Sequence, residues 1–297
     1  MNDIAHKQMV QKAVSAKFGS HQRLYSKAPP IYPAGVERES QRLSRAYMSI
    51  LQQTMKECMP EIIAAAKREK ENARTDGNDD LIAVVNRVFS EMRLMLSKKS
   101  DDFSLRSKLE KLANLNRKLS IREWKRAVKA TIGLDLMDDY YNSEFFRDTI
   151  PQWIDDNVNL ITSVPKETLD QMQQIVTEGY RKGKSTTQIS KEVRERYGVG
   201  KRKANLLARD QIAKLNGQLA QKQQQDAGCE EYIWSTSEDS RVRDSHRVLD
   251  GKKFRWDTPP DVGGGRHCNP GEDYQCRCVA LPVFDIETLN VPMAQEE

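Results

Sequence analysis

The segment AGCEEYIWSTS, residues 227–237, marks the point where the sequence changes its pattern. Before it, apolar residues recur at helical spacing among many Glu, Gln, Lys, Arg and Ala residues. After it, the runs EEYIWSTS and KKFRW and the segment 279–284 are typical of strands. The segments DGKK, TPPDVGGG and NPGED between them are typical of turns. We therefore predict a mainly α, elongated helical body followed by a small C-terminal α+β module.

The domain boundaries follow from the same patterns. SKAPPIYPAG, with three prolines and a glycine, closes a segment that we expect to be an extended arm. We predict this N-terminal arm over 1–35, the helical body over 36–226, the module over 227–285 and a mobile tail over 286–297. Within the body, helices are predicted for 36–74, 81–96, 104–115, 120–132, 138–162 with a break at Pro151, 163–183, 185–197 and 201–225.

Composition narrows the class of protein. The 297 residues are 38% hydrophobic and 31% charged, with a mean hydropathy of -0.74, which is typical of long, solvent-covered helices. No apolar run approaches the roughly 18 to 20 residues of a membrane span, and the first residues have no apolar signal core. We expect a soluble protein that is made in the cytoplasm and has no membrane partner.

Cysteine spacing suggests a metal site. Three of the five cysteines lie between 268 and 278, which in a cytoplasmic chain favours metal over a disulfide. Cys276 and Cys278 are two residues apart, so in a strand both side chains would face the same side and could bind one tetrahedral zinc. His246 is the predicted third ligand. A structural Zn²⁺ would stabilise a module that is too small to bury a large core.

The fourth zinc ligand is left open among His267, Cys268 and Asp273. A metal-free alternative also remains, in which the cysteines are small buried apolar residues and His246 is satisfied by hydrogen bonds. A disulfide between Cys276 and Cys278 would be strained and is the least favoured option.

A catalytic interpretation is possible for the charged stretch before the cysteines. Asp239, Arg241, Arg243 and His246 could supply a general acid or base and an anion clamp. No glycine-rich phosphate loop, nucleophile elbow or H-E-x-x-H motif accompanies them. An ion-paired hairpin flank is the commoner outcome, so we predict no enzymatic activity and keep a metal-dependent hydrolase using His246 as an alternative.

A basic segment offers a possible DNA contact. Residues 181–209 contain ten Lys or Arg against two Glu. Within them, the GVG sequence at 198–200 followed by Lys201, Arg202 and Lys203 fits a helix-hairpin-helix element that binds a DNA phosphate. The alternative is an ordinary connector between two helices, with a buried stripe after it. A zinc-stabilised nucleic-acid-binding protein acting outside a virion is therefore the second alternative function.

Three blocks of the C-terminal half occur in a characteristic order. The first block is ARDQ at 208–211. The second block comprises Trp234, Asp239, Arg241, Arg243, His246 and Gly251. The third block is PGED at 270–273 with Cys276-Arg277-Cys278 and Pro282. In these residues the stretch 153–284 resembles the phage Mu protein F-like family of minor head proteins, also called phage head morphogenesis proteins. One position departs from it, because many members have a histidine where this chain has Asp273.

The resemblance implies a virion protein of a tailed phage or prophage, present in low copy number inside the head near the portal. It implies roles in procapsid assembly and in DNA packaging or delivery, including ejection. The implied partners are the portal protein, capsid or scaffold proteins and, non-specifically, phage DNA, and the host cytoplasm is the place of assembly. Some relatives carry a toxin domain after this module, which we do not expect in a chain that ends at Glu297.

Overall fold

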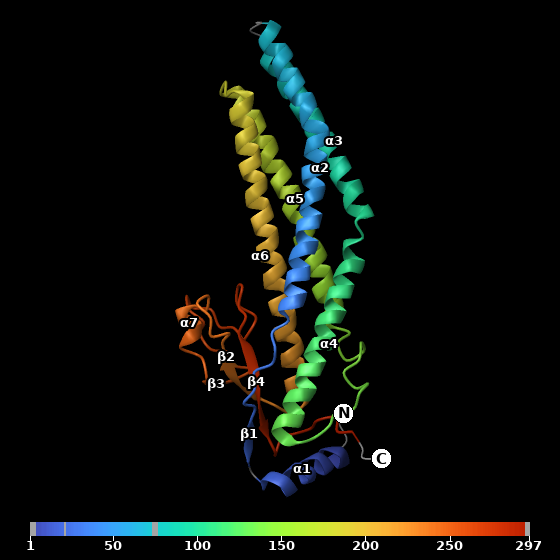
Figure 1. Cartoon of the computed structure of the whole chain (residues 1–297), viewed down its shortest axis with the longest axis vertical. Helices are drawn as coiled ribbons and strands as arrows, with labels where there is room; N and C mark the ends of the chain where they lie inside the picture. Colours follow the sequence, from blue (N-terminus) through green and yellow to red (C-terminus); the bar gives the residue numbers. More distant parts are fainter. Residues whose placement is uncertain (1–3, 21, 73–76, 295–297) are drawn as a thin grey trace. The chain divides into compact units, whose positions relative to one another are not determined.

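The structure is a computed structural model that describes residues 4–20, 22–72 and 77–294 (Figure 1). Within these ranges the chain forms seven helices and one antiparallel sheet of four short strands. The predicted fold class, mainly α with a small α+β part near the C-terminus, is confirmed. None of the described helices is both long and apolar enough to cross a membrane.

The elements follow one another in a simple order. The helices are α1 (Ile4–Phe18), α2 (Ala34–Asn72), α3 (Gly77–Asp102), α4 (Leu105–Ile132), α5 (Thr149–Arg181), α6 (Thr186–Asp226) and α7 (Asp244–Arg247). The strands are β1 (Arg23–Tyr25), β2 (Glu231–Ser235), β3 (Lys253–Arg255) and β4 (Val279–Asp285).

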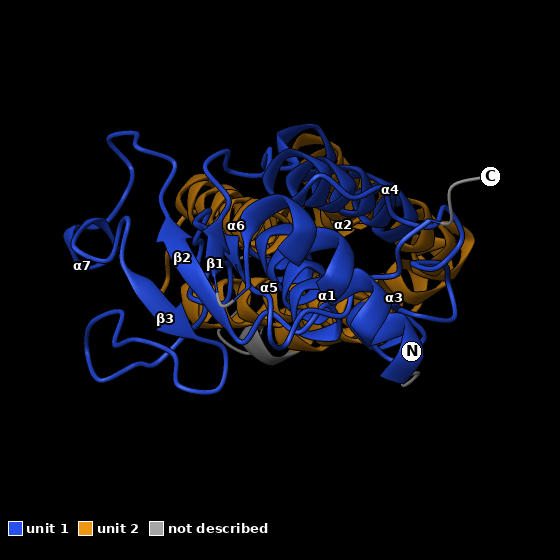
Figure 2. Ribbon diagram, turned by 90° about the horizontal axis from the view of Figure 1, so that it is seen from below, with its two compact units in different colours: residues 1–37, 112–153, 210–297 blue, residues 38–111, 154–209 orange. Residues whose placement is uncertain are grey.

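The chain forms two compact units, and each is built from separate segments (Figure 2). Unit 1 comprises residues 1–37, 112–153 and 210–297, and unit 2 comprises 38–111 and 154–209. The boundaries fall inside α2, α4, α5 and α6, so each of these helices contributes residues to both units. The units therefore divide the chain differently from the predicted boundaries at 36–226 and 227–285.

The described residues of unit 2 form helices and the short turns between them, and small residues allow these helices to pack closely. Ser40 and Ser44 of α2 donate hydrogen bonds from their hydroxyls to the backbone oxygens of Ala208 and Ala204 in α6. Gly200 of α6 also lies at a close approach, because a Cβ atom there would be 2.4 Å from Oγ1 of Thr168 in α5. Hydroxyls and small side chains on facing surfaces allow such backbones to come near one another.

The GVG sequence lies inside α6, which is continuous from Thr186 to Asp226. The predicted helices 185–197 and 201–225 are therefore one helix, and the predicted helix-hairpin-helix turn at 198–200 is wrong. A glycine at position 200 suits the interior of this helix because a Cβ atom there would come too close to Thr168 and Met48.

Two prolines led to further errors in the predicted helices. Pro151 lies in the first turn of α5, where its missing N–H would have had no partner in the helix. Pro165 lies in the interior of the same helix. Burial of Val164 and Leu169 on either side offsets the loss of a hydrogen bond, so α5 continues through this proline.

Residues 138–148 form turns and bends rather than the predicted helix. The side-chain oxygen of Asn142 accepts hydrogen bonds from the backbone N–H groups of Glu144 and Phe145. Such local bonding offers the backbone an alternative to helix.

The sheet belongs to unit 1 and has the order β1-β4-β2-β3 with all neighbours antiparallel (Figure 1). The strand β1, at one edge, comes from the segment that was predicted to be an extended arm. This prediction is wrong for the described part of 1–35, because that segment contains α1 and β1. Leu24 pairs with Phe284 across the β1–β4 ladder, and Val10 and Val14 of α1 are fully buried.

The segment after β4 is also fixed in unit 1. Leu289 and Val291 are buried, and the N–H of Ala294 donates to the backbone oxygen of Asp135. The prediction of a mobile tail is therefore wrong for residues 286–294, while residues 295–297 lie outside the described part of the chain.

One face of the sheet packs on a small apolar core that also holds the candidate site. Its buried members are Tyr232, Trp234, Leu249, Trp256, Val262, Cys276, Cys278 and Ala280. The core therefore joins β2 to the β2–β3 connection, to the loop before β4 and to the start of β4.

Candidate metal centre

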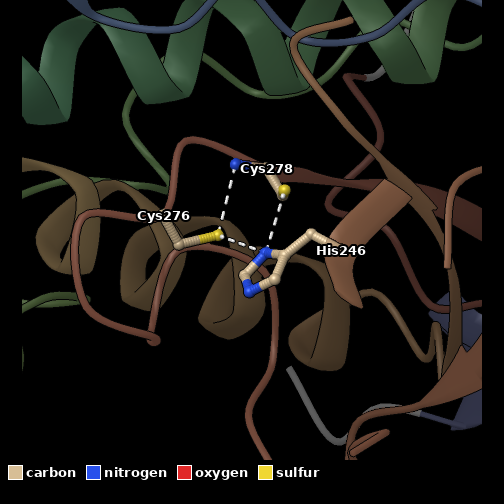
Figure 3. Close-up of side chains that lie close together, drawn as sticks. All are labelled: His246, Cys276 and Cys278. Atoms are coloured by element: carbon tan, nitrogen blue, oxygen red, sulfur yellow. Dashed lines mark hydrogen bonds between the residues drawn. The ribbon is translucent and has the colours of Figure 1, made fainter. Parts of the chain in front are cut away.

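Three side chains with metal-binding atoms converge in unit 1 (Figure 3). Nδ1 of His246 lies 3.5 Å from Sγ of Cys276 and 3.5 Å from Sγ of Cys278. All three ligand atoms lie within 4.8 Å of one another. The side chains are almost fully enclosed, with 2%, 3% and 7% of their residues' surface exposed in the same order.

His246 is presented by α7, a single helical turn in the connection between β2 and β3. The backbone N–H of His246 donates to the carbonyl of Arg243, which sets the start of this turn. The imidazole meets the buried Trp234 of β2 edge to face, with ring centroids 5.4 Å apart and an interplanar angle of 79°. Strand and turn together therefore fix the position of the ring.

The two cysteines lie immediately before β4 rather than within it. They face one another because the chain turns at Gln275, whose φ is +52°. The N–H of Gln275 donates to the buried carboxylate of Asp210 in α6 at 2.6 Å, which holds this unusual conformation. The N–H of Cys278 then donates to Sγ of Cys276 at 3.4 Å.

Asp273 lies on the opposite side of the histidine from the thiols. Its carboxylate is 3.0 Å from Nε2 of His246 and also pairs with Arg243 at 3.0 Å and Arg266 at 3.3 Å. Asp273 was one of the three residues considered for a fourth ligand, but its carboxylate contacts Nε2 of His246, the ring nitrogen that faces away from the thiols. Its position suits orientation of His246 rather than direct binding of a metal held by Nδ1.

The other two candidates lie outside the cluster of three. His267 is exposed, and its Nδ1 is 3.0 Å from the backbone oxygen of Pro259. Cys268 is partly buried and packs against the apolar core without joining the group of metal-binding atoms.

The thiols and the imidazole influence one another's protonation. The hydrogen bond with Cys278 lowers the pKa of Cys276 well below the ordinary value, and the contact with His246 adds to this against the effect of burial. The same Cys276 contact, followed by burial, raises the pKa of Cys278. Burial acts to lower the pKa of His246, but its contacts with Cys276 and Asp273 outweigh burial and raise it. The two thiols therefore have pKa shifts of opposite direction, and their mutual hydrogen bond is the largest cause of both.

The charged residues of the stretch before the cysteines form ion pairs. The carboxylate of Asp239 accepts hydrogen bonds from Arg277 at 2.6 Å and Arg241 at 2.9 Å. The guanidinium of Arg277, followed by that of Arg241, holds the pKa of Asp239 well below its usual range. Arg243 instead bonds to Asp273 and to the backbone oxygen of Tyr274.

Gly251 and Trp234 complete the wall of the site. Gly251 has a φ of +71°, which favours glycine, and its N–H donates to the backbone oxygen of Trp234. The sequence pattern singled out both residues without giving them a role. It also contained Asp210 within ARDQ, but only the structure shows that its carboxylate supports the turn before Cys276.

The predicted DNA-binding residues lie on exposed positions of α6 in unit 2. Lys203 forms an ion pair with Glu167 of α5 at 2.6 Å. Elsewhere in the basic segment, Lys184 pairs with Glu192 at 2.7 Å. Part of the positive charge of 181–209 is therefore balanced within the protein.

The residues that build this site fall within a recognised family pattern. Residues 170–281 match the family described as Phage Mu protein F like protein. The predicted family resemblance is confirmed over this segment. It covers the cluster of His246, Cys276 and Cys278 together with Asp210, which supports the turn before the cysteines.

Two curated relatives are similar to longer parts of the chain. Over 158 residues the chain is 32% identical to an uncharacterized protein of Haemophilus influenzae, an alignment that covers 53% of this chain and 34% of the relative. It is 22% identical over 279 residues to the Minor head protein GP7 of Bacillus phage SPP1, covering 82% of this chain and 90% of that protein. The chain thus spans about a third of the Haemophilus relative. No solved structure gives a significant match.

Proposed function

We propose that this chain is a minor head protein of a tailed phage or prophage. The observation that carries the proposal is the similarity to the SPP1 minor head protein over 82% of this chain and 90% of that protein. The family match over 170–281 supports it as well. In this role the chain is a component of the virion head, near the portal, and takes part in procapsid assembly and in DNA packaging or delivery.

The proposed role is structural rather than catalytic. His246, the residue on which a hydrolase would depend, is enclosed by Trp234 and the two cysteines, and its other ring nitrogen contacts Asp273. The neighbouring Asp239 and Arg277 bond to each other. These contacts are typical of a packed, ion-paired core and leave the histidine without open access to a substrate.

The proposed partner in the head is the portal protein, with capsid or scaffold proteins around it. Two helices of unit 2 expose large apolar side chains, Ile63 on α2 at 43% and Leu94 on α3 at 73%. Apolar side chains that remain exposed on amphipathic helices are suited to binding another protein.

The test is incorporation into procapsids assembled from the portal, major capsid and scaffold proteins of the same phage. We expect the parent chain to co-purify with procapsids that contain portal and to be absent from those assembled without portal. Ile63→Glu combined with Leu94→Glu should reduce incorporation at least about tenfold, because charged groups must then be desolvated at the contact.

Val248→Glu is the matched control, since Val248 is also exposed, at 60%, but lies beside α7 in unit 1. It should be incorporated like the parent. Equal incorporation with and without portal would contradict the portal association, and absence of the parent chain from every purified particle would contradict the head function itself.

A further inference from the structure

We propose that Nδ1 of His246 and the Sγ atoms of Cys276 and Cys278 bind a structural zinc ion. The proposed head function does not require this site, and neither the family description nor the relatives' names assign it. Asp273 is proposed as the residue that positions His246 for the metal. The cluster of three enclosed donor groups is the observation on which the inference rests.

The spacing of the three donor atoms suits tetrahedral zinc. Zinc binds thiolate sulfur at about 2.3 Å and imidazole nitrogen at about 2.0 Å, so a tetrahedral angle places sulfur and nitrogen about 3.5 Å apart. Both observed distances from Nδ1 of His246 to sulfur are 3.5 Å. The two nitrogen-to-sulfur distances therefore match those of a tetrahedral zinc site.

The second ring nitrogen shows which tautomer the site favours. A carboxylate 3.0 Å from Nε2 accepts its proton, so Nδ1 is left with a free lone pair directed toward the two thiols. Asp273 is itself held by Arg243 and Arg266, which keeps the carboxylate in place. Carboxylate, histidine and metal in this order form an arrangement that recurs in zinc sites.

The surroundings of the sulfur atoms also suit a charged ligand. The N–H of Cys278 donates to Sγ of Cys276, and Gln275 is fixed by Asp210 just before the pair. Two sulfurs and one imidazole nitrogen form a soft donor set, which favours zinc over calcium or magnesium. The ion would join α7 to the segment before β4, two parts of unit 1 that are about thirty residues apart in the chain.

The first experiment measures zinc in the purified full-length chain by elemental analysis after expression in zinc-supplemented medium. We expect one zinc per chain in the parent, and less than about a tenth of that in Cys276→Ser and Cys278→Ser. Cys268→Ser is the matched control, because Cys268 lies in the same core but outside the cluster, and it should keep one zinc. Loss of zinc in this control, or a zinc-free parent, would overturn the proposed ligand set.

The second experiment remains informative if a cysteine variant fails to fold. The parent chain is stripped of metal and titrated with Co²⁺, which should give the absorption of tetrahedral cobalt with sulfur-to-cobalt charge transfer, and Zn²⁺ should displace it. Asp273→Asn keeps a hydrogen-bond acceptor but removes the charge, so we expect about 10- to 100-fold weaker Zn²⁺ binding in competition with a chelator.

Unchanged Zn²⁺ affinity in Asp273→Asn would contradict the positioning role of Asp273. A metal-stripped parent that binds no Co²⁺ or Zn²⁺ would overturn the metal site and leave the three side chains as a hydrogen-bonded core. None of these readouts involves procapsids, so failure here and failure of the proposed head function can be told apart.

Discussion

Gly198 and Gly200 lie two residues apart in α6, yet their surroundings differ. A Cβ atom at Gly200 would be 2.4 Å from Oγ1 of Thr168 and 3.2 Å from Cε of Met48. Thr168 cannot easily rotate away, because its hydroxyl donates to the carbonyl of Val164 at 2.7 Å. At Gly198 only the flexible end of Arg202 comes within 4 Å. Replacing these two glycines by alanine should therefore change the stability of the protein in opposite directions.

We expect Gly200→Ala to lower the free energy of unfolding by about 1 to 3 kcal/mol, because the added methyl group overpacks the contact with Thr168. Gly198→Ala should instead raise it by up to about 1 kcal/mol, since alanine restricts the unfolded chain and favours helix. Urea unfolding followed by circular dichroism gives both values. Equal effects of the two substitutions would show that α6 does not pack as described.

At the scale of elements, the pairing of β1 with β4 gives the sheet one of its two outer strands. The N–H of Ile286 donates to the carbonyl of Gln22, and the N–H of Ser26 donates to the carbonyl of Pro282. Deleting residues 1–27 removes both of these partners. The exposed edge of β4 would then depend on β2 alone.

We expect this deletion to increase hydrogen exchange at the amide of Ile286 at least about tenfold, which corresponds to about 1.4 kcal/mol of local stability. The amide of Trp234, which donates to Lys252 on the other side of the sheet, should change less. Tyr25→Ala removes an exposed side chain and keeps the strand, so it should leave both amides protected. Unchanged exchange at Ile286 in the deletion would contradict the β1–β4 pairing.

The success of sequence-based prediction differed between elements for physical reasons. Apolar periodicity predicted most of the helices, and alternation with turn residues predicted β2, β3 and β4 close to their observed positions. The strand β1 was missed because its pairing with β4 bridges more than 250 residues and leaves no local signal. Pro165 and the GVG sequence misled the prediction, since burial within the helices of unit 2 outweighs their local preferences.

The candidate site shows the same limit. The spacing of Cys276 and Cys278 and the choice of His246 could be predicted from residue types, and the structure places these three together. The role of Asp273 could not be predicted from the sequence, because its carboxylate could either bind the metal or form a hydrogen bond with the imidazole ring. Only the distance to Nε2 distinguishes these two arrangements.

At the scale of the whole molecule, the distribution of charge bears on DNA. The helix α6 is continuous through 198–200, so the backbone N–H groups there are not free to bind a phosphate as in a helix-hairpin-helix element. Lys203 is already paired with Glu167. The remaining exposed residues Lys201 and Arg202 are a small part of the charge available on the chain.

We therefore expect the triple substitution of Lys201, Arg202 and Lys203 by Ala to bind duplex DNA like the parent at every salt concentration tested. Fluorescence anisotropy with a labelled duplex at a series of salt concentrations would measure this. If the three residues did bind phosphates, the slope of log affinity against log salt would flatten by roughly 0.9 for each phosphate that is no longer neutralised. A change of that size would restore the DNA-binding interpretation of this segment.

The interleaved order of the two units has a consequence for synthesis on the ribosome. Every residue of unit 2 has been made once residue 209 is joined, whereas unit 1 needs its last segment, 210–297. At about 5 to 20 residues per second, that segment takes on the order of 5 to 20 seconds to translate. During this interval β1 has no β4 to pair with, and α1 has no Val291 for the ring of His6 to contact. The N-terminal segment therefore lacks these partners until the last part of unit 1 has been made, and chaperones can bind it throughout that time.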